Sequence, residues 1–348
     1  MKVVHLPVFH GNAYQDLLVD AQRHLGLQVI DGGCGDFFRT ALMRWKADIL
    51  HFHWLHPYLI RPSILGTILR STRLLIELSI LKLFGQRIVW TVHNLKNHDN
   101  RHLVLERWFT KRFVRLPSAI IAHHQLGATE AASAFAISDP DRIHIIPLGN
   151  YIGCYPNQVS RREARERLGL DPEPVVLLFL GRIQPYKGVM ELIREFKTLR
   201  SDSRLVIAGT PADAEMAQTI RKEIGGTKNI IFHPRFVPGE QIQFYMNACD
   251  AVVLPYRQIL TSSAAMLAMS FGRACVAPRL SGMVELLDDR GAFLYEPDQL
   301  GALAEAIHAA ADNREKLDQM GIHNFAKVSD KDWATIAAAT LTIYRSVS

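Results

Sequence analysis

The chain has 348 residues, of which 48% are hydrophobic and 21% charged, a composition typical of a globular protein. At roughly 100–200 residues per domain, this length predicts two domains, each large enough to bury its own core. Four widely spaced cysteines without a CxxC pair exclude a small disulfide-bonded scaffold, and no secretory signal begins the sequence, so we expect a reducing, cytosolic compartment.

The net charge of +6 is concentrated in the first third of the chain. Residues 1–116 contain 16 basic and 8 acidic side chains, a balance of +8, which leaves −2 for the remainder. The longest apolar segment, residues 59–89, is interrupted by six charged residues, and a membrane-spanning helix needs about 18–20 uninterrupted apolar residues. We therefore expect no membrane span.

Short apolar runs alternate with helical patterns along the chain, which is typical of parallel strands joined by helices. In chain order, the first series of predicted strands is 3–8, 49–52, 87–92 and 119–122. After a polar stretch at 157–167, a second series covers 175–180, 204–208, 230–233, 251–254, 274–277 and 292–295, with helices predicted at 189–199, 239–248, 263–271 and 300–311. This order predicts two doubly wound α/β domains that face each other across an interdomain cleft.

The most informative segment is Gly181-Arg182-Ile183-Gln184-Pro185-Tyr186-Lys187-Gly188, which follows a predicted strand and opens a helix. Gly181 allows the backbone to approach a ligand, and Arg182 and Lys187 place two cations beside a helix N-terminus. This arrangement suits a diphosphate. An ordinary strand-to-helix loop with solvated cations is the alternative.

A second loop has the same character. Tyr256 follows a predicted strand, and Thr261, Ser262 and Ser263 stand at the start of the next helix. Hydroxyl groups there either cap the helix or donate to a phosphate oxygen.

The chain resembles the GT-B glycosyltransferases over nearly its whole length, on the loop that contains Arg182 and Lys187. It most resembles the xanthan-type β-mannosyltransferases of glycosyltransferase family 94, through His51-Phe52-His53-Trp54, Thr91-Val92-His93-Asn94, Asp332-Trp333 and Tyr344, and more distantly family 4. The two glutamates of the retaining family 4 motif are replaced here by Ile259 and Leu267. Glu285 or Glu296 is therefore a candidate for binding the donor ribose or sugar, with a turn or helix-end carboxylate as the alternative.

The resemblance implies two Rossmann-like domains, an acceptor-binding domain at residues 1–155 and a nucleotide-sugar-binding domain at 156–330, with a helix at 331–348 that crosses back to the first domain. It implies inverting transfer of mannose from GDP-mannose to a polyprenyl-diphosphate-linked oligosaccharide in exopolysaccharide or cell-surface glycan assembly. A UDP-sugar donor (glucose or glucuronate) and a non-catalytic sugar-nucleotide-binding module are the alternatives.

An inverting transfer needs a general base for the acceptor hydroxyl. Asp99, in a polar loop after a predicted strand, is the first candidate and His93 the second. Further residues at strand ends are predicted to line the cleft or the acceptor pocket; they are His10, Gly11, Asn12, His53, Trp54, Asn94, His98 and His124. For His53 and Trp54 simple packing is an equal alternative.

No metal or other cofactor is expected. His51, His53 and His56 have no carboxylate or cysteine at ligand spacing, and Pro140 makes the sequence Asp139-Pro140-Asp141 a turn rather than a metal motif.

Two basic segments, from Leu59 to Phe84 and from Arg107 to Arg115, mix cations with leucine, tryptophan and phenylalanine. Such helices bind anionic membrane surfaces, or pack on the sheet with a solvated cationic face. No nucleic-acid-binding module is present, so nucleic acid is not an expected partner. We expect a cytoplasmic enzyme, peripheral on the inner face of the cell membrane.

Overall fold

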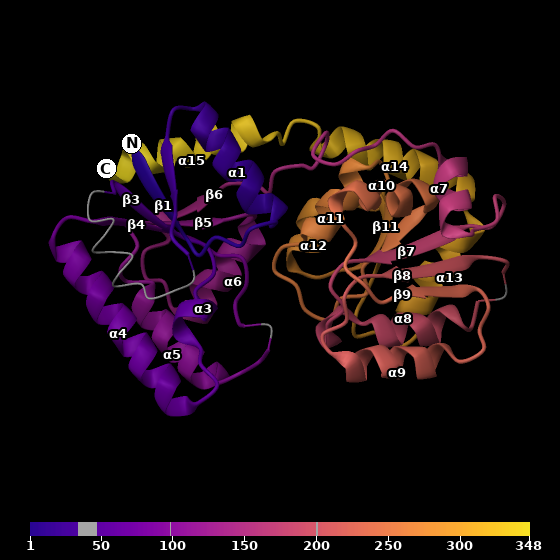
Figure 1. Cartoon of the computed structure of the whole chain (residues 1–348), viewed down its shortest axis with the longest axis horizontal. Helices are drawn as coiled ribbons and strands as arrows, with labels where there is room; N and C mark the ends of the chain where they lie inside the picture. Colours follow the sequence, from indigo (N-terminus) through magenta and orange to yellow (C-terminus); the bar gives the residue numbers. More distant parts are fainter. Residues whose placement is uncertain (34–46, 98, 200) are drawn as a thin grey trace. The chain divides into compact units, whose positions relative to one another are not determined.

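The computed structural model describes residues 1–33, 47–97, 99–199 and 201–348. The chain forms two compact units, Met1–Gly149 together with Lys331–Ser348, and Asn150–Asp330 (Figure 1). We call them unit 1 and unit 2. The division after Gly149 lies a few residues before the boundary expected from the sequence, and the C-terminal residues belong to unit 1.

Unit 1 is built on a parallel sheet with the order β2-β1-β3-β4-β5-β6. Its strands are β1 (Lys2–Leu6), β2 (Gln28–Asp31), β3 (Ile49–Phe52), β4 (Arg87–Thr91), β5 (Ala119–Ala122) and β6 (Ile143–Ile145). The prediction of only four strands here was too low. It missed β2 and β6, which are short edge strands with partly exposed residues and lack a continuous apolar run.

Helices cover both faces of this sheet. On one face α1 (Ala13–His24) packs against α15 (Trp333–Val347), which brings the two ends of the chain together (Figure 1). Among the described residues, the other helices of unit 1 are α3 (His56–Leu59), α4 (Ile64–Leu83), α5 (Leu103–Phe113) and α6 (Gln125–Phe135), with the short 3₁₀ turn η1 (Pro140–Arg142).

Unit 2 contains a parallel sheet with the order β12-β11-β10-β7-β8-β9. Its strands are β7 (Val176–Leu180), β8 (Arg204–Ala208), β9 (Ile230–His233), β10 (Ala251–Val253), β11 (Ala274–Pro278) and β12 (Ala292–Tyr295). All six were predicted to within two residues at each end. Every residue of β7 is buried, as the apolar sequence Val-Leu-Leu-Phe-Leu requires at the centre of a doubly wound sheet.

The helices of unit 2 alternate with its strands. They are α7 (Arg161–Leu168), η2 (Pro185–Lys187), α8 (Val189–Phe196), α9 (Ala214–Ile224), α10 (Gly239–Ala248), α11 (Ser263–Ser270), α12 (Ser281–Leu286), α13 (Ala302–Asp312) and α14 (Arg314–Val328). The two sheets and their helices confirm the predicted GT-B-like α/β fold class.

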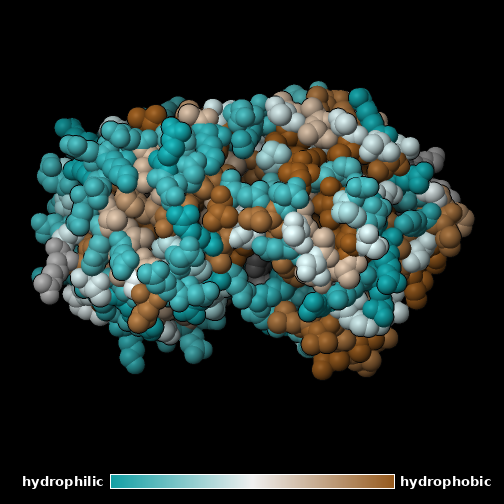
Figure 2. Space-filling view, turned by 180° about the vertical axis from the view of Figure 1, so that it is seen from behind, coloured by the Kyte–Doolittle hydropathy of each residue, from teal (hydrophilic) through white to brown (hydrophobic). Residues whose placement is uncertain are grey.

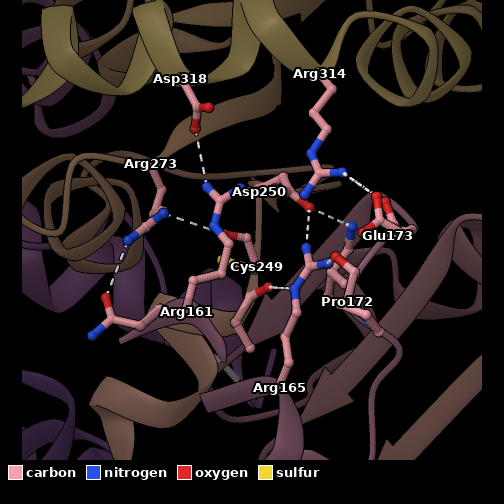
Figure 3. A network of polar contacts seen from close by, with 12 residues as sticks. Arg161, Arg165, Pro172, Glu173, Cys249, Asp250, Arg273, Arg314 and Asp318 are labelled. Atoms are coloured by element: carbon pink, nitrogen blue, oxygen red, sulfur yellow. Dashed lines mark hydrogen bonds and ion pairs between the residues drawn. The ribbon is translucent and has the colours of Figure 1, made fainter. Parts of the chain in front are cut away.

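A buried ion network joins β7 and β10 at their amino ends (Figure 3). Asp250 accepts hydrogen bonds from the Val176 amide and from Arg165, both at 2.7 Å, and pairs with Arg161 at 2.9 Å. Arg165 is only 2% exposed and also donates to the Ala248 carbonyl oxygen at 3.1 Å. This network closes the end of the sheet opposite to the strand ends described next.

Candidate functional site

Two loops meet at the carboxyl edge of the unit 2 sheet. Residues 181–188 follow β7 and residues 254–262 follow β10, the neighbouring strand, where the strand order reverses direction. Ligands of doubly wound sheets bind at this reversal. Helix α8 begins at Val189 and helix α11 at Ser263, so unpaired N–H groups of two helix N-termini lie at the same edge.

Close backbone contacts fix the positions of these loops. Gly188 has a φ of 67°, and a Cβ at this position would overlap the Pro255 carbonyl oxygen. At Gly209, with a φ of 146°, a Cβ would overlap the carbonyl oxygen of Gly181. The Arg257 amide also donates to the Tyr186 carbonyl oxygen at 2.8 Å. Only glycine permits these contacts, so the backbone at the strand ends is held in one arrangement.

Lys187, near the end of the first loop, has its ammonium group beside the buried ring of Tyr256. Its Nζ lies 5.4 Å from the centre of the Tyr256 ring, which is buried and 6.5 Å from the ring of Tyr186. Burial, and to a lesser extent the nearby Arg182, lowers the pKa of Lys187 to about 8. Within the described ranges Lys187 forms no ion pair. Its ammonium is therefore poorly solvated and not neutralised, the condition in which a bound anion is most favourable.

The three hydroxyl residues of the second loop have different roles. Ser262 caps α11, because its Oγ accepts from the Ala265 amide at 3.1 Å. Ser263 is exposed at the first position of the helix. The Thr261 Oγ1 is buried, and it has no partner among the described residues. Thr261 is therefore the hydroxyl that remains available to a ligand.

The two candidate glutamates lie at the carboxyl ends of β11 and β12. Glu285 is exposed on α12, and Glu296, also exposed, follows β12. Glu296 lies 3.6 Å from Arg279, which also pairs with Asp289 at 2.7 Å. Glu296 therefore shares its partner with a second carboxylate.

In unit 1 a row of imidazoles runs along the strand ends. Nδ1 of His5 lies 2.7 Å from Nε2 of His53, Nδ1 of His53 lies 3.1 Å from Nε2 of His93, and Nδ1 of His93 lies 3.4 Å from Nε2 of His123. We call these four rings the histidine row. They come from β1 and from the residues that follow β3, β4 and β5.

The histidine row is covered by α1 and α15. The Tyr14 ring packs edge-on against His53, His93 and His123, at 4.9 to 5.8 Å between ring centres, and against Trp333 of α15 at 5.4 Å. Burial lowers the pKa of every ring in the row, for His5 and His123 to about 4. The row is therefore neutral near pH 7.

Two predicted acceptor residues belong to this layer. His53 is fully buried in the row, whereas Trp54 is partly exposed and stacks on His93 with 4.4 Å between ring centres. His93 is partly exposed, and both of its ring nitrogens are engaged in the row. His93 can act as a base only when one of these contacts opens.

The other predicted residues of unit 1 lie at the same strand ends. Asn12 caps α1 by accepting from the Tyr14 amide, and His124 caps α6 by accepting from the Gly127 amide at 2.9 Å. His10 follows β1, is exposed and lies 3.1 Å from Asp31, and Gly11 has a φ of 79°. Asn94 donates to the Lys96 carbonyl oxygen at 2.9 Å, Asp99 is exposed, and His98 lies outside the described residues.

Sequence reasoning missed several residues of these edges. His5 was passed over because it stands inside an apolar strand, although the register pairs it with His51. Glu106, a buried carboxylate whose pKa is raised by burial, lines a small pocket with His93 and Asn94 and accepts from the Asn97 amide at 3.0 Å. Ser281 at the start of α12 has a buried hydroxyl without a partner in the described ranges.

Comparison with known proteins gives the geometry a context. Residues 160–325 match the family of glycosyl transferases group 1. The chain is 28% identical over 281 residues to a GDP-mannose:glycolipid 4-β-D-mannosyltransferase of Xanthomonas campestris, which covers 77% of this chain and 72% of the relative. It is also 28% identical over 246 residues to a D-inositol 3-phosphate glycosyltransferase of Streptomyces scabiei, covering 67% of this chain and 55% of the relative.

Solved structures share the fold over the whole chain. A sucrose-phosphate synthase of Thermosynechococcus elongatus superposes with a TM-score of 0.80 at 16% identity, covering 100% of this chain and 99% of the other. HepE of Anabaena, in complex with UDP and glucose, superposes with a TM-score of 0.77 at 18% identity, covering 99% of this chain and 100% of the other.

Proposed function

Since the chain is a group 1 glycosyltransferase with the GT-B fold, taking its sugar from a nucleotide sugar, we propose that it is an inverting mannosyltransferase that uses GDP-mannose. The proposed acceptor is a polyprenyl-diphosphate-linked oligosaccharide in exopolysaccharide or cell-surface glycan assembly. The observation that supports this choice best is the 28% identity, over 281 residues, to a mannosyltransferase whose name states GDP-mannose and a glycolipid.

In this proposal the donor lies at the carboxyl ends of β7 and β10. Lys187 and Arg182 bind the diphosphate, together with the N–H groups at the start of α8 and the Thr261 hydroxyl. The bond from the anomeric carbon to the diphosphate breaks, and its electron pair stays on the leaving diphosphate. The fixed positive charge of Lys187 stabilises the negative charge that develops on that leaving group in the transition state.

The acceptor hydroxyl attacks the opposite face of the anomeric carbon and loses its proton to a base. Asp99 is the first candidate for this base because it is an exposed carboxylate in the loop that follows β4, and His93 at the end of the same strand is the second. Gly11, His10 and the exposed part of Trp54 are proposed to line the acceptor path.

A UDP-sugar is the second candidate for the donor. It is favoured by the structural similarity to HepE, whose structure contains UDP and glucose. The two donors differ in the base that unit 2 must recognise, and both use the same diphosphate contacts.

We further propose that unit 1 binds an anionic membrane surface through α4 and α5. Along α4 an exposed apolar stripe includes Leu65, Leu69, Ile76 and Leu83, whose exposed fractions are 67%, 62%, 55% and 86%. Figure 2 shows hydrophobic side chains gathered at the lower right, over the part of unit 1 where α4 lies. A helix of 20 residues is about 30 Å long.

Cations flank this stripe on α5. Trp108 is 46% exposed, and the Arg112 guanidinium stacks on its ring at 3.0 Å. Each cation near an anionic surface adds about 1 kcal/mol of attraction. No helix in the described part of the chain is both long enough and apolar enough to cross a bilayer. An apolar stripe beside a row of cations is typical of a helix that lies in the plane of the membrane interface.

Product analysis with a polyprenyl-diphosphate oligosaccharide tests the function directly. Purified protein is incubated with GDP-mannose, UDP-glucose or UDP-glucuronate, and the product is examined for sugar, linkage and anomer. A β-linked mannose from GDP-mannose supports the proposal, and transfer only from a UDP-sugar replaces it with the second candidate. Absence of transfer from any donor refutes both.

A further inference from the structure

The hydrogen bonds of the histidine row determine how many protons it holds. The row ends on the Gln22 side chain, whose Oε1 lies 2.8 Å from Nε2 of His5, and on the Ile146 carbonyl oxygen, 3.0 Å from Nδ1 of His123. Five hydrogen bonds therefore join four rings to two ends, and each bond needs one proton. Four neutral imidazoles supply four protons.

The fifth proton has two sources. If Gln22 turns its amide nitrogen toward His5, the amide donates and the whole row is neutral. If Gln22 keeps its oxygen toward His5, both ends of the row are acceptors. A neutral row then has one contact without a proton, where two ring nitrogens face each other with lone pairs, and one additional proton completes that contact. Amide oxygen and nitrogen have nearly the same shape, so a half-turn of the Gln22 side chain exchanges the two states.

A second series of hydrogen bonds, from Gln22 through Tyr344 and His51 to Thr91, can reverse its direction with this half-turn, and no charge changes along it. The Gln22 amide lies 3.1 Å from the Tyr344 hydroxyl, which lies 2.6 Å from Nδ1 of His51, and Nε2 of His51 lies 2.7 Å from the Thr91 hydroxyl. When Gln22 donates to Tyr344, Tyr344 donates to His51 and His51 donates to Thr91. In the other state each of these three hydrogen bonds reverses, so His51 changes tautomer. Both states satisfy every polar group, and they differ by one proton.

We propose that His93, rather than Asp99, is the base, and that through His93 the histidine row accepts the proton that the acceptor hydroxyl loses during transfer. The inference rests on the proposed function. As the acceptor oxygen forms its bond to the anomeric carbon, the bond to the diphosphate breaks, and the hydroxyl proton passes to His93. The row then holds one imidazolium, Gln22 accepts from His5, and the proton later leaves to water through His93.

The geometry favours His93 as the entrance. It is the partly exposed member of the row, whereas the other three rings are buried. Its contact with His123, at 3.4 Å, is the longest in the row and therefore the one that two facing lone pairs fit best when the Gln22 oxygen faces His5, so Nδ1 of His93 then has a lone pair that can accept a proton. Because the other nitrogen of His93 is hydrogen-bonded to His53, a proton that arrives at one nitrogen can be passed on from the other.

The surroundings keep the row neutral between transfers. Burial dominates the low pKa of each ring, and neighbouring imidazoles lower the pKa of His53 and His93 further. The titratable or polar groups that face the row come from α1, β2, β3 and the residue before α6, and Thr91 of β4 and Tyr344 of α15 reach it through His51; the groups that face the row are Tyr14, Gln22, Arg23, Asp31, His51 and His124. Arg23 lowers and Asp31 raises the pKa of His5.

A metal ion is a less suitable occupant of this layer. Nitrogens of His5, His51 and His53 lie within 4.8 Å of one another, a spacing that could hold an ion. All six ring nitrogens of these residues already have hydrogen-bond partners, however, so an ion bound by all three rings would have to displace at least two of those contacts.

Gln22→Glu tests the proposal on the full chain. The carboxylate can only accept from His5, so it favours the protonated row, and an opposite charge at this distance raises a pKa by roughly 1–3 units. We expect the acidic limb of kcat to move to higher pH by about this amount while KM for the nucleotide sugar is unchanged. In ¹⁵N NMR of the imidazoles without substrate, protonation of His5, His53 and His93 should move in the same direction.

Gln15→Glu is the matched control. Gln15 is a buried amide of the same helix that donates to the Pro7 carbonyl oxygen and accepts from the Phe9 amide, without contacting the row. It should leave both the pH limb and the imidazole signals unchanged. An equal effect of Gln15→Glu overturns the proposal, as does a shift in the imidazole signals of Gln22→Glu without a shift in kcat.

If Gln22→Glu does not fold, a measurement on the wild-type chain tests the proposal instead. The single-turnover rate is measured across mixtures of H₂O and D₂O. Because several protons move together along the row, we expect a curved dependence on the D₂O fraction, and a linear dependence overturns the proposal. If no donor supports transfer, the proposed function fails. The imidazole titration of Gln22→Glu then still shows whether the row takes up a proton.

Discussion

Lys187→Met should stabilise the nucleotide-free protein while removing its response to nucleotide. The pKa of Lys187 falls from 10.5 to about 8, mainly through burial. One pKa unit corresponds to about 1.4 kcal/mol, so charged Lys187 costs the folded state up to about 3 kcal/mol. Methionine fills similar space beside Tyr256 without a charge to desolvate. In a domain of this size each kcal/mol changes Tm by about 2–4 °C, so a rise of several degrees is expected.

The same pKa sets the sign of the pH dependence. Because the folded pKa lies below the unfolded value, the unfolded chain binds more protons between pH 8 and 10.5, and the free energy of unfolding rises across that window. Lys187→Met lacks this rise. A bound diphosphate reverses the effect, since it favours the ammonium, so affinity for GDP should weaken as the pH increases through about 8.

Differential scanning calorimetry with and without GDP measures both effects. Lys222→Met, an exposed lysine of α9, is the control and should change neither Tm nor the response to GDP. If Lys187→Met lowers Tm in the absence of nucleotide, the assignment of a desolvation penalty is wrong. If the variant keeps the full GDP-induced rise, Lys187 does not bind the diphosphate.

Three further predictions follow from the site and the fold. Asp99→Asn distinguishes the two candidate bases: with His93 as the base it should leave kcat and donor affinity nearly unchanged, whereas a loss of about 10²–10⁴-fold in kcat would identify Asp99 as the base and overturn proton entry at His93. Asp250→Asn leaves the buried Arg165 without its counter-charge and should cost about 3–5 kcal/mol in urea unfolding; a loss below 1 kcal/mol would show that the network is dispensable. The fraction of protein that sediments with anionic liposomes should fall when four cations in or next to α5 are replaced by glutamine. Unchanged binding would show that this segment does not contact the membrane. The four residues are Arg107, Lys111, Arg112 and Arg115.

Much of unit 2 could be predicted from local sequence. Buried parallel strands such as β7 are continuous apolar runs, and the loops after β7 and β10 are marked by glycine, cations and hydroxyl residues. Unit 1 was harder to predict because its edge strands β2 and β6 are short and partly exposed, so they resemble loops. The histidine row of unit 1 is also polar where a core is expected to be apolar.

The individual roles of the hydroxyl residues needed the structure. Ser262 and Thr261 are chemically similar neighbours, yet one caps α11 and the other has a buried hydroxyl without a partner in the described residues. Which of them turns toward the helix depends on the backbone path between Pro255 and α11, and residue type alone does not encode that path.

The sequence by itself determined the two-domain α/β architecture, the family resemblance and the cationic loop at Arg182 and Lys187, because each is written in contiguous residues with a fixed spacing. Only the tertiary structure brought His5, His53, His93 and His123 into one hydrogen-bonded row and closed it with Gln22 of α1. These residues come from four strand ends and a helix. His5 and His123 are 118 residues apart (123 − 5), and parallel pairing places such residues side by side irrespective of their distance along the chain.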